Sequence, residues 1–151
     1  MKIALSFLNQ LWLNKKDNLK SVKEIVQKAS NQSVDLLIFP EMTLTGFYVD
    51  SLEYSEEYNN SNSIRSFSKF SSKYNIGIVF GLSCIDNLQS KYITNDLIYI
   101  NQDGKVSGRY SKIHPFSIGN ENKIFRAGGK ISIFNILGIN LGTSICYDLR
   151  F

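Results

Sequence analysis

The sequence has few of the residues that build metal sites and covalent frameworks. Its 151 residues include two cysteines and one histidine. Neither Cys84 nor Cys146 belongs to a CxxC pair or to a Cys/His cluster, and a chain of this length can bury a core without disulfides. We therefore expect neither a disulfide framework nor a metal site.

Long apolar runs and blocks of one charge are also missing. No stretch approaches the ~20 apolar residues of a membrane span, and Met1–Leu13 lacks the longer apolar core and cleavage site of a signal peptide. The net charge of +4 comes from lysines and arginines scattered among carboxylates, which argues against a nucleic-acid partner. We expect a cytoplasmic protein that binds neither membranes nor nucleic acid.

The apolar residues that are present follow patterns typical of a folded α/β domain. They make up 43% of the chain, enough for a globular core. Apolar residues alternate in Lys2–Leu8, which predicts a strand, and recur at helical spacing in Leu19–Ala29. The continuous apolar run Asp35–Phe39, ended by Pro40, predicts a strand buried on both faces. The chain is thus predicted to open as β-α-β.

Another helix and strand follow, and then two hairpins. Thr43–Asn62 is read as a loop with a helical turn. After it, apolar spacing predicts a helix over Ile64–Tyr74 and a buried strand over Ile76–Ile85. The hairpins are predicted from glycine turns: Tyr92–Asn101 with Val106–Tyr110 around Asp103-Gly104, and Ile131–Ile136 with the buried strand Ile139–Cys146 around Leu137-Gly138. This pattern predicts one α/β unit, a mixed sheet with helices on at least one face.

Two reactive side chains stand at the ends of predicted strands. Glu41 follows one buried strand and Cys146 ends another, and ligand sites in open α/β sheets lie outside the carboxyl ends of strands. A thiol becomes a useful nucleophile when a base takes its proton or a cation lowers its pKa. Glu41 and Lys112 could serve these purposes. Taken singly, each residue has an ordinary explanation: a buried thiol, a solvated carboxylate and a surface charge.

Three segments together carry a specific resemblance. Phe39–Phe47, Asp103–Phe116 and Gly142–Phe151 resemble, in the same order, the segments of the nitrilase superfamily of carbon-nitrogen hydrolases that present its glutamate, lysine and cysteine. The resemblance covers essentially the whole chain. It implies that the catalytic residues are Glu41, Lys112 and Cys146.

The resemblance implies further site residues. Glu121 would be a second carboxylate beside the lysine, and the backbone N–H of Tyr147 would stabilise an oxyanion. The residues expected to contact substrate are Phe47, His114 and Arg150. Arg150 would suit a substrate carboxylate, although an ordinary ion pair explains it equally well. The motif wording is most similar to omega-amidase-type members, which hydrolyse the side-chain amide of small dicarboxylic acid monoamides.

The resemblance also implies a chemical scheme. Glu41 would accept the proton of Cys146, the sulfur would attack an amide or nitrile carbon to form a thioester, and Lys112 would stabilise the oxyanion and favour the thiolate. No cofactor is needed. A Cys146–His114 pair, as in Cys-His thiol hydrolases, is the competing scheme. We favour Glu41 as the base, because the Cys-His scheme leaves it without a role.

Family members are α-β-β-α sandwiches in which a second half follows the cysteine segment. We therefore expect residues 1–151 to form the N-terminal portion of such a sandwich, a partial carbon-nitrogen hydrolase domain whose C-terminal part is absent. Either the chain belongs to an amidase of small-molecule amides, which as a complete protein would form a homo-oligomer, or it is a truncated non-catalytic fragment. The DNA downstream of codon 151 would distinguish the two.

Overall fold

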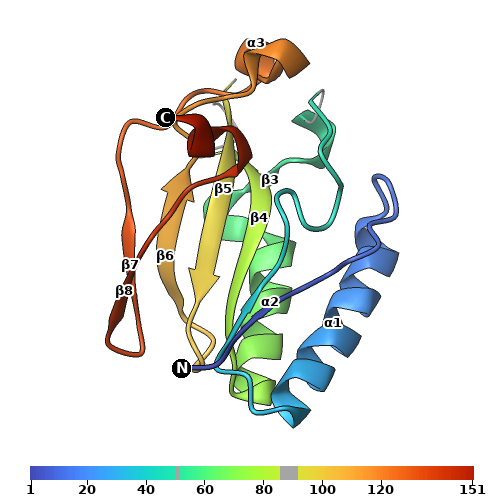
Figure 1. Ribbon diagram of the computed structural model, residues 1–151. Helices are drawn as coiled ribbons and strands as arrows, with labels where there is room; N and C mark the ends of the chain where they lie inside the picture. The colour runs from blue at the N-terminus through green and yellow to red at the C-terminus, as the bar shows by residue number, and fades with distance from the viewer. Residues whose placement is uncertain (50–51, 86–91) are drawn as a thin grey trace.

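The chain folds around one mixed sheet (Figure 1), seen in a computed structural model that describes residues 1–49, 52–85 and 92–151. Its strands are β1 (Ile3–Leu5), β2 (Leu36–Ile38), β3 (Glu56–Glu57), β4 (Gly77–Ile85), β5 (Ile93–Ile100) and β6 (Val106–Ser111). The strand order is β1-β2-β4-β5-β6, with β3 paired to the far end of β4. β1, β2 and β4 are parallel, whereas β4, β5 and β6 are antiparallel. The predicted α/β class is confirmed.

Two helices cover one face of this sheet. Helix α1 (Lys15–Asn31) begins where the Asn14 side chain accepts a hydrogen bond from the backbone N–H of Asp17, and α2 (Asn62–Tyr74) begins with an equivalent cap by Ser61. Both helices bury an apolar stripe against the sheet, where the ring of Phe67 stacks on that of Phe80 at 3.8 Å between centroids. Both helices were predicted.

Among the described residues, no helix has the length and apolar character needed to cross a membrane.

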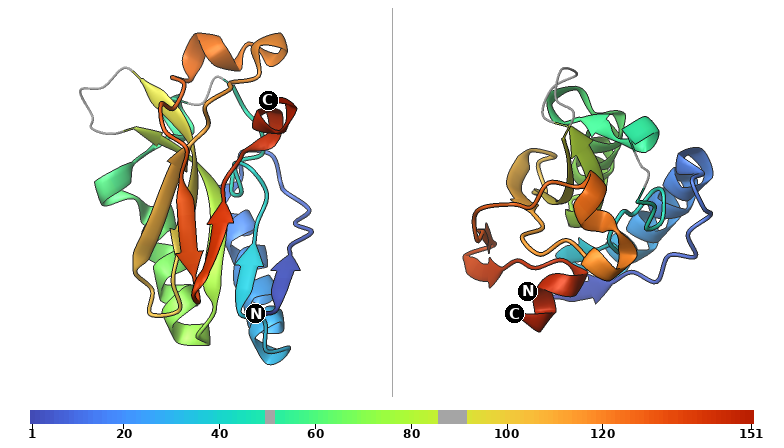
Figure 2. Two further views of the ribbon diagram at one scale, coloured as in Figure 1. Left: turned by 60° about the vertical axis from the view of Figure 1, so that its left-hand side comes forward. Right: turned by 90° about the horizontal axis from the view of Figure 1, so that it is seen from above.

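A hairpin covers part of the other face. Strands β7 (Ile133–Ile136) and β8 (Ile139–Gly142) form a separate two-stranded sheet, which Figure 2 shows standing in front of β5 and β6. Phe134 and Ile136 of the hairpin pack with Tyr99 and Tyr110 of the main sheet. The molecule therefore has a helix layer, a sheet layer and the hairpin as a third layer.

Parts of the strand and loop predictions were wrong. The predicted buried strand Ile139–Cys146 ends at Gly142, and Cys146 instead begins the 3-10 helix η4 (Cys146–Arg150). β8 is also largely exposed, since it has a partner strand on one side only. The predicted loop Thr43–Asn62 contains helical turns, as expected, at η1 (Leu52–Tyr54) and η2 (Tyr58–Asn60), but also the unpredicted strand β3. Asp50 within this loop lies outside the described residues. The short η3 (Ser117–Gly119) and α3 (Glu121–Ile124) were not predicted.

Candidate active site

The backbone of Glu41 lies directly across strand β4. A Cβ atom at Gly81 would sit 2.4 Å from the backbone nitrogen of Met42 and 2.8 Å from the Cα atom of Glu41, so only glycine permits this crossing. The amide of Gln10 donates hydrogen bonds to the carbonyls of Met42 and Thr43, each at 3.1 Å. The segment that follows β2 is therefore held from two sides, and the position of Glu41 is well defined.

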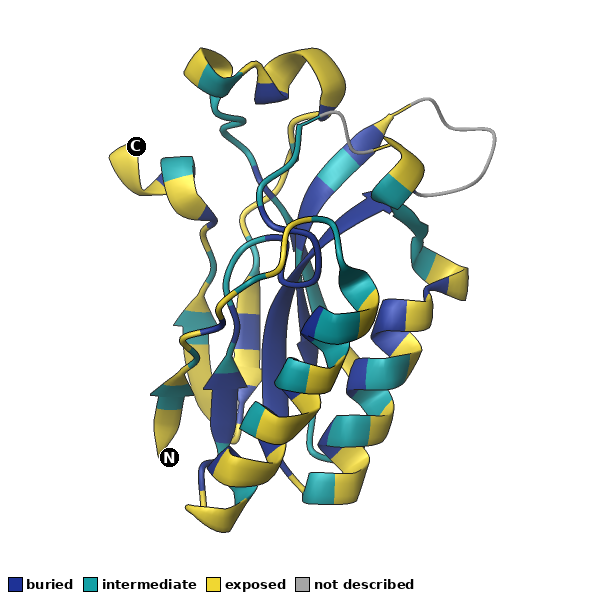
Figure 3. Cartoon of the chain, turned by 90° about the vertical axis from the view of Figure 1, so that its right-hand side faces the viewer, coloured by how far each residue is buried: buried dark blue, intermediate teal, exposed yellow. Residues whose placement is uncertain are grey.

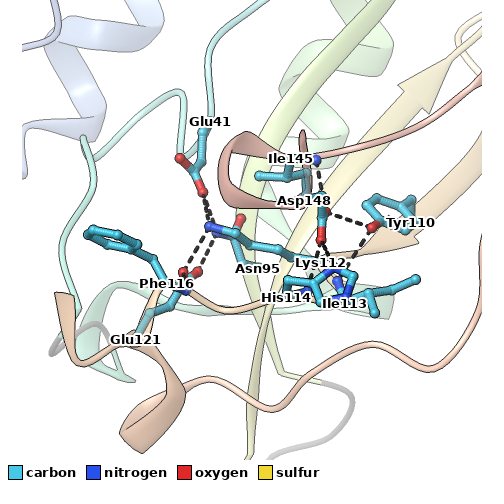
Figure 4. Close-up of polar contacts among 10 residues, drawn as sticks. All are labelled: Glu41, Asn95, Tyr110, Lys112, Ile113, His114, Phe116, Glu121, Ile145 and Asp148. Carbon is cyan, nitrogen blue, oxygen red and sulfur yellow. Dashed lines mark hydrogen bonds and ion pairs between the residues drawn. The ribbon is translucent and has the colours of Figure 1, made fainter. Parts of the chain in front are cut away.

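Lys112 stands between two carboxylates immediately after strand β6. Its Nζ atom lies 2.9 Å from Oε1 of Glu41 and 2.8 Å from Oε2 of Glu121, as Figure 4 shows. The lysine is 1% exposed. Burial alone would lower the pKa of Lys112, but its hydrogen bonds to Glu121 and Glu41 outweigh burial and raise that pKa. The side chain is therefore a fixed ammonium ion.

Glu121 is completely buried at the start of α3. Besides Lys112, its Oε2 atom accepts a hydrogen bond of 2.6 Å from the backbone N–H of Phe116, which lies on the loop after β6. The unpredicted turn η3 and helix α3 thus serve to bring this carboxylate back to the lysine.

Asn95 of strand β5 completes the cluster, and sequence reasoning missed it. Its Nδ2 atom donates to Oε1 of Glu41 at 2.7 Å and to Oε1 of Glu121 at 2.8 Å. The available signal was a polar residue on the strand face that also carries Leu97 and Tyr99, both part of the apolar packing under the hairpin.

Cys146 lies beside Glu41 at the start of η4, with a left-handed backbone (φ 47°). Together with Glu41 and Asn95 it lines a cleft of about 160 Å³. Burial of the sulfur and the nearby Glu41 carboxylate raise the pKa of the Cys146 thiol. Lys112 lowers that pKa, in the direction expected of a neighbouring ammonium, but its effect is outweighed. The thiol is therefore protonated at neutral pH.

The turn that carries Cys146 is anchored by Asp148. Its carboxylate accepts hydrogen bonds from the Tyr110 hydroxyl (2.6 Å) and from the backbone N–H groups of Ile145 (3.0 Å) and His114 (2.8 Å). Burial opposes ionisation, yet these bonds lower the pKa of Asp148, and burial together with Asp148 raises the pKa of Tyr110 to about 12. An ionised aspartate thus ties the cysteine turn to strand β6. Sequence reasoning assigned it no role.

The histidine belongs to this anchor. His114 Nδ1 lies 3.0 Å from Oδ1 of Asp148, and its ring stacks on that of Phe151 at 4.1 Å. No hydrogen bond joins His114 to Cys146 in the described part of the chain. The geometry therefore gives the competing Cys-His scheme no support.

The other predicted residues lie around the cluster at different depths. Lys112 Nζ lies 5.6 Å from the centre of the Phe47 ring. The backbone N–H of Tyr147 donates to no described residue. Arg150 is exposed, lies 5.9 Å from the Tyr147 ring centre, and has no carboxylate among the described residues within ion-pair distance. The structure thus brings Phe47 to the cluster and leaves Arg150 at the surface.

No three His, Cys, Asp or Glu side chains of residues 1–49, 52–85 and 92–151 form a metal-binding group.

Comparisons with known proteins all lead to one family. The family model of carbon-nitrogen hydrolases matches residues 2–151. The chain is 31% identical to Probable nitrilase C965.09 of Schizosaccharomyces pombe over 140 residues, which are 90% of this chain and 51% of that protein. It is 25% identical to 2-oxoglutaramate amidase of Bacillus subtilis, covering 89% and 51% of the two chains. For omega-amidase NIT3 of Saccharomyces cerevisiae the identity is 27%, with coverage of 100% and 56%.

Solved structures share the fold. The chain superposes on XC1258 of Xanthomonas campestris, a CN-hydrolase superfamily protein with an arsenic adduct in its active site, with a TM-score of 0.88 and 23% identity over 99% of this chain and 54% of that one. An amidase variant from Nesterenkonia sp. AN1, with acrylamide added to its active-site cysteine, gives a TM-score of 0.86 at 19% identity, covering 100% and 59%. The chain spans about half the length of the curated relatives it matches.

Proposed function

Since this chain belongs to the carbon-nitrogen hydrolase family, we propose that it hydrolyses the carbon-nitrogen bond of a small amide through a thioester on Cys146. One observation carries the proposal. The Glu41 carboxylate accepts a hydrogen bond from the ammonium of Lys112 and lines the same cleft as the Cys146 thiol. A carboxylate that is held by a cation and faces a thiol is arranged to act as a general base.

The reaction follows from these contacts. Glu41 takes the thiol proton as sulfur attacks the amide carbon. The negative charge that develops on the carbonyl oxygen is stabilised by Lys112 and by the backbone N–H of Tyr147. Protonated Glu41 then gives its proton to the departing amine, which leaves a thioester. Water attacks the thioester, Glu41 accepts the water proton, and the acid departs as the thiol is restored.

We propose a dicarboxylic acid monoamide as the substrate class. Two relatives are named 2-oxoglutaramate amidase and omega-amidase, and Arg150 is an exposed cation close in sequence to Cys146. A guanidinium can bind a substrate carboxylate through two hydrogen bonds. Cytoplasmic location and homo-oligomer formation stay predictions of the sequence.

The nucleophile is tested by replacing each cysteine. Cys146→Ala should abolish ammonia release from a panel of small amides, while Cys84→Ala should leave it largely intact, because Cys84 is buried among apolar residues. The assay is run on this chain and on any longer chain that contains it, and circular dichroism checks the fold. Turnover close to wild type in Cys146→Ala would sink the assignment.

The choice of base is tested by a second pair of variants. Glu41→Gln should lower the hydrolysis rate by ~10²-fold or more, since a positioned general base contributes that much. His114→Asn should lower it much less, because His114 contacts Asp148 rather than the thiol. The opposite ranking would favour a Cys-His enzyme.

A further inference from the structure

Asn95 stands where the two carboxylates of the site meet. It is 1% exposed, and its single amide nitrogen donates to both Glu41 and Glu121 at 2.7 and 2.8 Å. Rotating the amide by 180° would turn its oxygen toward two carboxylates, so this network permits one orientation only. Its Oδ1 atom accepts no hydrogen bond from a described residue. Burying an amide oxygen without a hydrogen bond costs free energy. The two hydrogen bonds that Nδ2 donates therefore contribute more than the bond that Oδ1 lacks would.

These bonds solve two problems that Lys112 alone leaves open. The first is charge, because two carboxylates share one ammonium ion and like charges in a buried site repel each other. The second is direction. Lys112 and Asn95 both bind Oε1 of Glu41, so Oε2 is the oxygen left for the Cys146 thiol. Without Asn95, the carboxylate could rotate about its bond to Lys112.

From this geometry we infer that Asn95 is a positioning residue for the reaction: by binding Oε1 of Glu41 it aims Oε2 at the sulfur of Cys146. The inference rests on the proposed role of Glu41 as the base. The charged and titratable groups that face Glu41 are Lys112 after β6, Glu121 on α3 and Cys146 on η4. Asn95 on β5 is the uncharged donor among them.

The test is the rate of Cys146 alkylation by iodoacetamide at one fixed pH, followed by mass spectrometry at that residue. Asn95→Ala should lower this rate several-fold, because Glu41 is then no longer aimed at the thiol. Asn95→Asp keeps the shape but replaces the donating amide with an acceptor, so it should lower the rate at least as much.

Asn18 provides the matched control. It is also 1% exposed and donates two hydrogen bonds, but to the backbone carbonyls of Leu11 and Leu44. Asn18→Ala should lower stability without lowering the alkylation rate. An unchanged rate in both Asn95 variants, or an equal fall in Asn18→Ala, overturns the inference.

A further variant separates this inference from the proposed function. If Glu41→Gln lowers the alkylation rate while the Asn95 variants match wild type, Glu41 acts as the base without Asn95. If Glu41→Gln leaves the rate unchanged, Glu41 is not the base, and the proposed function fails together with the inference.

Discussion

Gly81 fixes the position of Glu41, the proposed base, without contributing a side chain. The Glu41 segment crosses β4 so closely that any Cβ atom at this position would overlap the backbone of Met42 and Glu41. Backbone atoms cannot move aside as the end of a flexible side chain can. The position of Glu41 therefore depends on the absence of a side chain at Gly81 in the neighbouring strand.

We expect Gly81→Ala to displace Glu41 from the cysteine. Overpacking of this kind costs about 1–3 kcal/mol in unfolding free energy, and a displaced base should lower Cys146 alkylation and amide hydrolysis by ~10²-fold. Gly129→Ala is the control, since a Cβ there meets nothing within 4 Å. Equal alkylation rates in the two variants would show that the crossing does not position Glu41.

At the scale of single residues, part of the cluster could be anticipated. The motifs pointed to Glu41, Lys112, Glu121 and Cys146, and the first three share hydrogen bonds in the structure; their catalytic roles stay proposals. Asn95 was missed because its partners are 54 and 26 residues away in the sequence, so strand periodicity shows that it faces inward but not what it meets.

Among the elements, Glu56 of β3 joins the starts of both helices. Its carboxylate binds Lys15 of α1 at 2.6 Å, the Ser61 and Ser63 hydroxyls at 2.6 Å each, and the Ser63 backbone N–H at 2.9 Å. Burial opposes ionisation, but these bonds lower the pKa of Glu56 to about 2. One short strand thereby fixes where α1 and α2 meet the sheet.

Because the folded-state pKa of Glu56 lies below its ordinary value of 4.5, its stabilisation is present above pH 4.5 and is lost as pH falls toward 2. The linked free energy is on the order of 3 kcal/mol. Glu56→Gln should lower the urea midpoint of unfolding at neutral pH. The midpoint of this variant should also fall less steeply than that of wild type as the pH drops from 4.5 toward 2. Unfolding is followed by Trp12 fluorescence. Glu57→Gln, whose side chain bonds no described residue, should behave like wild type. A Glu56→Gln midpoint that falls as steeply as that of wild type would contradict this account.

Most helices and strands could be predicted from the sequence. The predictions failed where contacts between residues of different elements determine the backbone conformation. Helices α1 and α2 and strands β2 and β4 carry clear apolar patterns, and the Asp103-Gly104 turn marks β5 and β6. The segment Thr143–Cys146 continues the apolar pattern of β8, yet it leaves the strand, because Asp148 bonds the N–H of Ile145 and turns the backbone. A hydrogen bond made by a residue further along the chain is invisible to periodicity.

Over the whole molecule, large apolar side chains remain exposed along one side. Leu5 is 80% exposed, Phe7 93%, Ile133 66%, Leu149 79% and Phe151 77%. Figure 3 shows the N-terminal strand and the C-terminal turn with exposed positions on the same side of the chain. Extensive exposed apolar surface on a monomer favours association.

Residues 1–151 expressed alone should therefore associate and bind the dye ANS. Phe7→Lys together with Leu5→Lys should raise the soluble fraction and reduce dye binding with little change in the urea midpoint, because neither side chain packs in the core. Leu37→Lys, at a position that is 1% exposed, should unfold the chain. A monomeric wild type with a sharp melt and no dye binding would refute the expectation.

The long sequence separations within the site also bear on how the protein folds. Lys112 and Glu41 are 71 residues apart, whereas β7 and β8, which lead into Cys146, are joined by a two-residue turn. Local hairpins close quickly, and contacts across long loops form late because loop closure costs entropy. We therefore expect the turn that carries Cys146 to form before Glu41, the proposed base, reaches it. A reactive Cys146 should then appear only in the last stage of folding, when the parallel strands have paired and Glu41 has reached the lysine.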